Sequence, residues 1–287
     1  MRIDRASGPG GLETWVLSGE GAEVRVVPSR GALVTHWSVG GEALLFLDEA
    51  TLVDRARNVR GGIPLLFPNA GPLPAEGVRF DGRTITQPQH GLARLAAWEV
   101  VDAISDDVTA RVAMRLTSSD VTRAGYPFDF SSDVAVSLSD GRLLLEWRIT
   151  NTGDAVMPLQ VGTHPYFAVP LSQKPRAQAP SRASQLKERR TGQVRAATPV
   201  AFGDGEVDVV LLDHGPAATL LRGDGSRIEL SATPQLSTLV LWTLPDQPFI
   251  CVEPWTAPGG ALATGDGVIT LAPGATEAFA IEHRFVR

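Results

Sequence analysis

The chain has 287 residues, of which 43% are hydrophobic and 20% charged, a composition typical of a soluble globular protein. Its 26 basic and 32 acidic side chains give a formal net charge of −6, whereas a duplex nucleic-acid binder is usually basic. The single cysteine, Cys251, excludes an internal disulfide and a cysteine-based zinc or iron–sulfur site. The N-terminus has no apolar signal-peptide region, and no apolar run approaches about 18 residues. We therefore expect a cytoplasmic protein with no nucleic acid and no membrane among its partners.

The apolar residues recur with a period of two, which is typical of strands with one solvated face. In chain order, short β-like runs flank Asp81-Gly82, alternating runs cover 108–116 and 128–138, and another covers 143–149 after Asp140-Gly141. Two further runs flank Asp224-Gly225. Asp-Gly between alternating runs is a strong hairpin signal.

Glycine and proline, 29 and 21 residues respectively, are scattered along the chain and leave few windows for a long helix. The pattern predicts an all-β fold with many antiparallel strands, most simply a large β-sandwich. We expect one domain over residues 1–287, because no internal repeat or linker divides the chain.

One segment, 172–195, lacks this alternating strand pattern, since it holds seven basic residues, one acidic residue and few large apolar side chains. This composition predicts a mobile loop that leaves the sheet and buries little. An anion-binding or partner-binding patch is the alternative interpretation.

Among five histidines, His164 has the most informative context, Gly-Thr-His-Pro-Tyr-Phe. Pro165 restricts the preceding residue to extended backbone, and two aromatic residues follow. An imidazole held in this way beside aromatic rings suits a sugar site, where it would move protons near neutral pH. A structural histidine remains an equal alternative on these grounds alone.

Glu253 stands at the end of an apolar run that should be a buried strand. A buried carboxylate is costly unless it is paired, hydrogen-bonded or functional. Arg60, before a Gly-Gly turn, and Arg94, in Gln89-His90-Gly91-Leu92-Ala93-Arg94, add polar groups that either bind a ligand or pin their loops.

Six motifs in order give a specific resemblance: RGGIPLLFP (60–68), QHGLAR (89–94), YPFDF (126–130), GTHPYF (162–167), GEVD (205–208) and CVEPWTAPGGAL (251–262). Together they resemble the aldose 1-epimerase family, in particular its bacterial branch and the related hexose-6-phosphate mutarotases. The resemblance spans roughly residues 20–285. It implies a galactose mutarotase-like β-supersandwich and an isomerase of carbohydrate metabolism that needs no cofactor and no metal.

The resemblance also implies roles for individual residues. His164 would be the general acid and Glu253 the general base of a ring-opening reaction, and we expect the two to face each other across a cavity for one pyranose ring. Arg60, Gln89, His90 and Arg94 match positions that hold sugar hydroxyls or a phosphate. Asp208, in GEVD, matches an acidic residue that binds hydroxyls or orients the site.

Departures from the galactose-type enzymes leave the preferred sugar open, because this chain has Val59-Arg60 and a single His90 where those enzymes carry Asn-Arg and a longer His-rich stretch. We expect an aldose 1-epimerase acting on a hexopyranose, with a hexose 6-phosphate as the alternative substrate. A silent carbohydrate-binding module, with Phe67, Tyr166 and Trp255 as stacking platforms, is one rival, and a glycoside hydrolase using Glu253 and Asp208 is another. We expect a monomer or homodimer.

Overall fold

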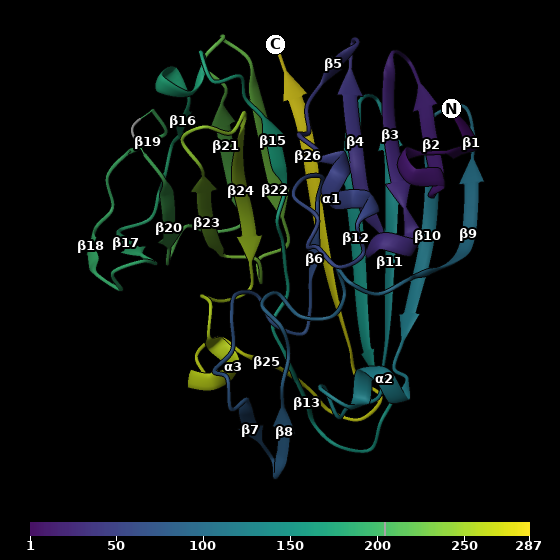
Figure 1. The fold of residues 1–287 in the computed structure, drawn as a ribbon, viewed down its shortest axis with the longest axis vertical. Helices are drawn as coiled ribbons and strands as arrows, with labels where there is room; N and C mark the ends of the chain where they lie inside the picture. Colours follow the sequence, from purple (N-terminus) through teal and green to yellow (C-terminus); the bar gives the residue numbers. More distant parts are fainter. Residues whose placement is uncertain (204) are drawn as a thin grey trace.

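The computed structural model describes residues 1–203 and 205–287, and these residues form mainly antiparallel β-sheets (Figure 1). The N-terminal sheet contains, in spatial order, β1 (Arg2–Ser7), β2 (Glu13–Gly19), β3 (Ala22–Val27), β4 (Leu33–Val39) and β5 (Glu42–Ala43). The nine-stranded sheet has the order β19 (Val200–Ala201), β16 (Gln178–Ala179), β21 (Ala217–Leu221), β22 (Arg227–Ala232), β26 (Thr276–Val286), β12 (Arg142–Asn151), β11 (Phe130–Ser139), β10 (Ala110–Thr117) and β9 (Glu99–Ser105). The all-β prediction is confirmed.

A third, eight-stranded sheet carries most of the residues discussed below. Its order is β18 (Val194–Ala196), β17 (Gln185–Glu188), β20 (Val207–Leu211), β23 (Thr238–Thr243), β24 (Phe249–Trp255), β14 (Gly162–Thr163) and β6 (Leu65–Leu66), with β15 (Tyr166–Ala168) also paired to β24. Two small two-stranded sheets pair β7 (Val78–Phe80) with β8 (Arg83–Ile85) and β13 (Met157–Leu159) with β25 (Ile269–Leu271).

Helices are short throughout the described residues. The α-helices are α1 (Glu49–Val53), α2 (Asp120–Arg123) and α3 (Ala261–Thr264), and the 3-10 turns are η1 (Pro9–Gly11), η2 (Pro28–Arg30) and η3 (Lys174–Arg176). Within the part of the chain that the structure describes, none of these helices has the length and apolar character needed to span a bilayer.

The hairpins lie where Asp-Gly predicted them. Ser139 pairs with Arg142 around Asp140-Gly141, and Phe80 pairs with Arg83 around Asp81-Gly82. Leu221 pairs with Arg227 around the third Asp-Gly, so β21 and β22 also form a hairpin. The turn chemistry therefore determines which neighbouring strands pair.

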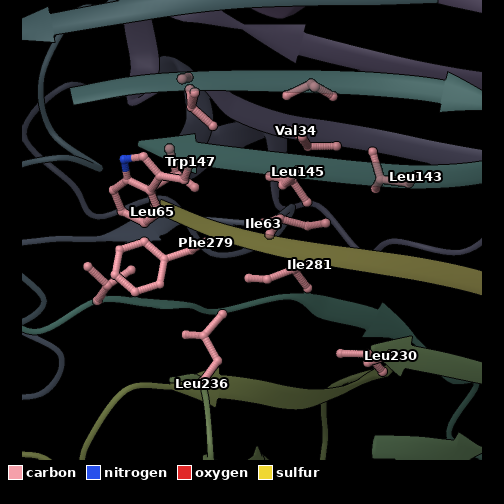
Figure 2. Packing of buried hydrophobic residues seen from close by; sticks show 14 of the residues in the cluster. Val34, Ile63, Leu65, Leu143, Leu145, Trp147, Leu230, Leu236, Phe279 and Ile281 are labelled. Carbon is pink, nitrogen blue, oxygen red and sulfur yellow. The ribbon is translucent and has the colours of Figure 1, made fainter. Parts of the chain in front are cut away.

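One hydrophobic core connects the three large sheets (Figure 2). Val34 of β4, Leu65 of β6, Leu145 of β12 and Ile281 of β26 belong to the same buried cluster. The alternation predicted for β10 is confirmed, since its even-numbered residues from Ala110 to Leu116 are buried and the residues between them are more exposed. Each fully buried aliphatic side chain contributes about 1.5–3 kcal/mol relative to exposure, so this core is the main source of stability.

The basic segment 172–195 is mostly exposed, as its composition predicted, but it does not leave the sheets altogether. It supplies β16 to the nine-stranded sheet and β17 to the eight-stranded sheet, and β18 begins at Val194. Lys174 is 2% exposed, and its Nζ donates to Thr243 Oγ1 at 2.8 Å and to the Gln247 carbonyl at 3.0 Å. A buried cation with hydrogen-bond partners can anchor a segment of low apolar content. Apart from Lys174, the buried residues here are Ala177, Ala179 and Leu186, so the segment buries little, as predicted, and its mobility stays a prediction.

Candidate active site

Strand register brings His164 beside Glu253. On one side β14 pairs with β24 through Gly162 and Trp255, and on the other side β15 pairs with β24 through Tyr166 and Cys251. His164 lies midway between the two paired residues on its segment, and Glu253 lies midway between theirs. The two side chains are therefore neighbours because the same strand, β24, is paired before and after Pro165.

The His164–Glu253 contact is close and almost completely shielded from solvent. His164 Nε2 lies 3.4 Å from Glu253 Oε1, and the side chains are 12% and 1% exposed. From the sequence we expected the two side chains to face each other across a cavity. In the structure they lie side by side instead. Among residues 1–203 and 205–287, neither Glu253 oxygen accepts a well-formed hydrogen bond, and the nearest donors are His164 Nε2 and the Trp255 indole N–H.

Aromatic rings hold the His164 imidazole in position. The ring stacks on Tyr166 with centroids 4.7 Å apart and meets Trp242 edge-on at 5.7 Å. The backbone N–H of His164 donates to the Pro64 carbonyl at 3.0 Å. These contacts restrict the rotation of the ring and keep Nε2 next to the carboxylate.

A tight turn places His90 beside His164. His90 has φ +68° and Gly91 φ +72°, and a Cβ on Gly91 would lie 2.1 Å from the Phe67 carbonyl oxygen. Left-handed backbone is unfavourable for histidine, and the fold maintains it by a buried contact in which the Gly71 N–H donates to His90 Nδ1 at 3.0 Å. The two imidazoles, His90 and His164, meet edge-on with centroids 5.5 Å apart.

A cavity of about 210 Å³ collects the polar residues that the sequence singled out. Its walls include Arg60, Gln89, His90, Arg94, His164 and Asp208. Glu253 lies buried next to His164 and completes the set. All seven residues, from motifs far apart in the chain, are thus brought together.

Three arginines line the cavity as well. Arg60 lies 5.8 Å from the Trp242 ring centroid, and Arg94 Nη2 donates to the Gln89 carbonyl at 2.8 Å. The third, Arg189, was not singled out from the sequence. Its Nη1 donates to Asp208 Oδ1 at 3.0 Å, and its guanidinium lies 5.6 Å from the Trp255 ring centroid.

Arg189 also lines a second, larger cavity of about 490 Å³ together with Asp208. It follows directly after β17, and its backbone N–H donates to the Asp208 carbonyl at 3.0 Å. The pairing of β17 with β20 therefore delivers Arg189 to the site. The only sequence signal was the cluster of basic residues in 172–195, which had been assigned mainly to a loop.

The aromatic residues of the site also differ from expectation. Phe67 is fully buried in the core and Trp255 is fully buried beside Arg189, so neither is an open stacking platform. Tyr166 lines the cavity as expected, and Trp242 does so without having been proposed. Trp242 follows an apolar run, and alternation along β23 turns it away from the core.

Burial keeps this site largely uncharged at its centre. It lowers the pKa of His164 to about 3, with further lowering by the nearby Arg94, and lowers the pKa of His90 to about 2, where the charge of His164 adds to the effect. Burial also raises the pKa of Glu253, against the opposing effect of Arg189. Burial therefore favours the neutral forms of the Glu253 carboxyl and of both imidazoles.

Comparison with known proteins supports the family resemblance of the sequence motifs. The aldose 1-epimerase family model matches residues 13–284. A solved structure of a protein from Synechocystis sp. PCC 6803 is 31% identical, with 99% of each chain covered and a TM-score of 0.92.

Two curated relatives are provisionally named glucose-6-phosphate 1-epimerase. The protein from Cenchrus ciliaris is 26% identical over 93% of this chain and 82% of its own length. The protein from Salmonella typhimurium is 32% identical, but the match covers 36% of this chain and 32% of the relative. With a family model that spans nearly the whole sequence, the chain belongs to the aldose 1-epimerase family.

Proposed function

We propose that this protein is an aldose 1-epimerase that interconverts the α and β anomers of a hexopyranose. The observation that carries the proposal is the contact between His164 Nε2 and Glu253 Oε1, 3.4 Å long, beside a polar cavity of about 210 Å³. That volume is below the roughly 300–1,000 Å³ of pockets for drug-sized ligands and suits a small polar molecule.

The spacing of the pair matches the reaction. Mutarotation removes the proton from the anomeric O1 hydroxyl and gives a proton to the ring oxygen O5, and both oxygens are bonded to C1. Two proton-transfer groups that lie side by side can therefore reach both oxygens of one sugar. After the C1–O5 bond breaks, rotation about C1–C2 exposes the other face of the aldehyde, and the same groups close the ring.

The proton shared by the pair has to be on His164 when the ring opens. Burial favours the neutral pair, but an anomeric hydroxyl that donates to Glu253 stabilises its carboxylate, as does the charge of Arg189. Sugar binding would therefore move the shared proton to His164 over the 3.4 Å contact. Glu253 then takes the O1 proton while His164 protonates O5.

Around this pair, the other polar residues would hold the sugar. Gln89 and Asp208 offer amide and carboxylate groups to hydroxyls, and His90 is kept neutral by burial, so it can bind a hydroxyl without adding charge. Trp242 and Tyr166 would cover apolar parts of the ring.

Polarimetry on freshly dissolved α-glucose and α-galactose tests the proposal. We expect the protein to accelerate the approach to anomeric equilibrium in proportion to its concentration. A silent carbohydrate-binding module would bind sugar without accelerating this approach. Release of a new reducing end from a glycoside would instead indicate a hydrolase.

A hexose 6-phosphate is the second candidate substrate. Arg60 and Arg94 line the cavity, and neither makes an ion pair within the described residues. Two guanidinium groups free of carboxylates suit a phosphate, which they can bind through charge-assisted hydrogen bonds. The provisional names of the two curated relatives agree with this choice.

The variant Arg94→Ala separates the two substrates. If Arg94 holds a phosphate, its removal should raise KM for glucose 6-phosphate far more than KM for glucose, and added salt should reduce the difference. Arg115→Ala, on the exposed outer face of β10, is the matched control. Equal effects on both sugars would mean that Arg94 binds a hydroxyl or supports its loop.

A further inference from the structure

The only thiol of the chain lies next to the catalytic pair proposed above. Cys251 and Glu253 are two residues apart on β24, so their side chains emerge on the same face of the sheet. Cys251 is fully buried, and one ligand atom each from Cys251, Glu253 and His164 all lie within 4.8 Å of one another. Thiol, carboxylate and imidazole are the three ligand types that zinc takes in proteins.

The spacing of two of these atoms already suits a tetrahedral ion. Zinc binds nitrogen and oxygen at about 2.0–2.2 Å, so two such ligands at a tetrahedral angle stand about 3.4 Å apart. His164 Nε2 and Glu253 Oε1 are separated by 3.4 Å. The Cys251 sulfur lies within 4.8 Å of a ligand atom of each residue, so a shift of no more than about 1 Å brings it to its own bond length of about 2.3 Å.

The Glu253 carboxyl independently indicates an unfilled binding site. It is 1% exposed, and in the described part of the chain neither oxygen accepts a well-formed hydrogen bond, although His164 Nε2 lies 3.4 Å from Oε1 and the Trp255 indole lies nearby. A divalent cation bound by a thiolate and a carboxylate would leave the buried site formally neutral, which removes the cost of an isolated charge there. His164 lines the cavity, so an ion can enter from that side and keep its fourth position for water.

We propose that His164 Nε2, Cys251 Sγ and a Glu253 oxygen form a site for a soft divalent cation such as Zn²⁺ or Cd²⁺, and that its occupation blocks the sugar reaction. One thiol cannot build a cysteine-based zinc site, but the imidazole and carboxylate supply the other ligands. The thiolate selects soft cations over Mg²⁺, which prefers six oxygen ligands. Because the cation occupies both proton-transfer groups, it competes with the sugar rather than assisting it.

Direct titration with Cd²⁺ tests the site without any sugar. A cadmium–thiolate bond gives an ultraviolet charge-transfer band, and with a single cysteine in the chain this band can come only from Cys251. In untagged wild-type protein we expect a band that saturates at one Cd²⁺ per chain and does not appear with Mg²⁺. Absence of the band at saturating Cd²⁺ would overturn the proposal even if no variant could be prepared.

The variant Cys251→Ser should lose the band and bind Zn²⁺ more weakly, by about tenfold or more. Cys251→Ala serves the same purpose should the serine variant fail to fold. His36→Asn, a change at a histidine of the N-terminal sheet, is the control and should leave both measurements unchanged. Equal Zn²⁺ affinity in wild type and Cys251→Ser would exclude Cys251 as a ligand.

The inhibitory part rests on the proposed function and needs its own measurement. Zn²⁺ should slow wild-type mutarotation, its apparent inhibition constant should rise with sugar concentration, and Cys251→Ser should remain active and resist Zn²⁺. A cadmium band with no inhibition of an active enzyme would overturn the blocking role. If the protein accelerates no mutarotation at all, the proposed function fails, while the band still decides the metal site.

Discussion

The centre and the rim of the cavity are built in different ways. The centre, His164 and Glu253, is held by strand pairing on both sides of β24 and is nearly closed to solvent. The rim, Arg60, Arg94 and Arg189, lies on connecting segments between strands. Arg94 is positioned by a local hydrogen bond to the Gln89 carbonyl, whereas Arg189 is positioned by its ion pair with Asp208 on β20.

This difference separates two tasks. Burial at the centre suppresses charge, so the proton can move between neighbouring groups with little solvent reorganisation. The rim keeps its charges, because a guanidinium stays protonated under nearly all conditions. We therefore expect changes at the centre to affect kcat and changes at the rim to affect mainly KM and substrate choice.

The largest expected effect is at the centre. Replacing His164 by Asn or Glu253 by Gln should lower kcat by roughly 10²–10⁴-fold each, the usual contribution of a general acid or base. Polarimetry at saturating sugar measures this effect, and circular dichroism checks that the variants are folded. Near wild-type turnover in either variant would show that the proton-transfer groups lie elsewhere.

The next largest effect is the pH dependence of stability caused by buried histidines. His283 is fully buried against Trp37 and Phe167, and burial lowers its pKa to about 4. Above pH about 6.5 it is neutral in both states and contributes nothing. As the pH falls toward 4 the unfolded chain binds a proton that the folded chain does not, so the free energy of unfolding decreases by about 3 kcal/mol.

Urea unfolding at several pH values measures this decrease. His164 and His90, with pKa values of about 3 and about 2, act in the same direction and extend the loss to lower pH. The variant His283→Leu should show a smaller decrease between pH 6.5 and 4 than the wild type. An unchanged pH dependence would mean that His283 is protonated in the folded protein.

Local sequence signals made His164 and Glu253 candidate residues, and only the resemblance gave them roles. Pro165 and the apolar run before Glu253 are local signals, since each restricts its neighbours whatever the rest of the chain does. Asp-Gly turns are equally local, and the hairpins that they form were predicted with them. The resemblance of the motifs then connected Arg60, Gln89, His90, Arg94 and Asp208 to one site.

Arg189 and Lys174 could not be found in this way, because both depend on long-range pairing. Arg189 reaches the cavity only because β17 pairs with β20, and no local pattern specifies that partner. Lys174 is buried by the β23–β24 connection, about 70 residues later in the chain. Composition correctly indicated that most of this segment is exposed, but it could not show that Lys174 anchors the segment through buried hydrogen bonds.

The variant Lys174→Met tests whether this anchor matters. Methionine keeps most of the volume but leaves Thr243 Oγ1 and the carbonyls of Leu244 and Gln247 without the ammonium donor. We expect a loss of about 1–3 kcal/mol in the free energy of unfolding. Faster proteolysis within 172–195 should accompany it, while Lys187→Met, on β17 of the same segment, should leave both unchanged.

A stability equal to that of the wild type would support the prediction that 172–195 is a weakly held, mobile segment. In that case Arg189, carried by the same segment, would also be weakly positioned. The variant at Lys174 therefore tests how this segment is anchored, and a variant at Arg189 tests what the segment contributes to the cavity.

The smallest expected effect is at Arg189. Replacement by Met removes the ion pair with Asp208, whose pKa burial already raises, so its carboxylate would hold sugar hydroxyls less well. We expect KM to rise about tenfold, or about 1.4 kcal/mol, with little change in kcat at high pH. Steady-state polarimetry as a function of sugar concentration measures both constants.

A pH profile distinguishes positioning from mere support of the fold. Arg189 lowers the pKa of Glu253, so its removal should move the loss of activity at low pH toward higher pH. Arg189→Lys should restore part of the shift, because it returns the charge without the planar guanidinium. Arg195→Met removes an exposed ion pair with Glu188 on the same segment and should change neither KM nor the profile. If Arg189→Met behaves like Arg195→Met, Arg189 has no part in sugar binding. Of the three rim arginines, only Arg60 and Arg94 would then contribute.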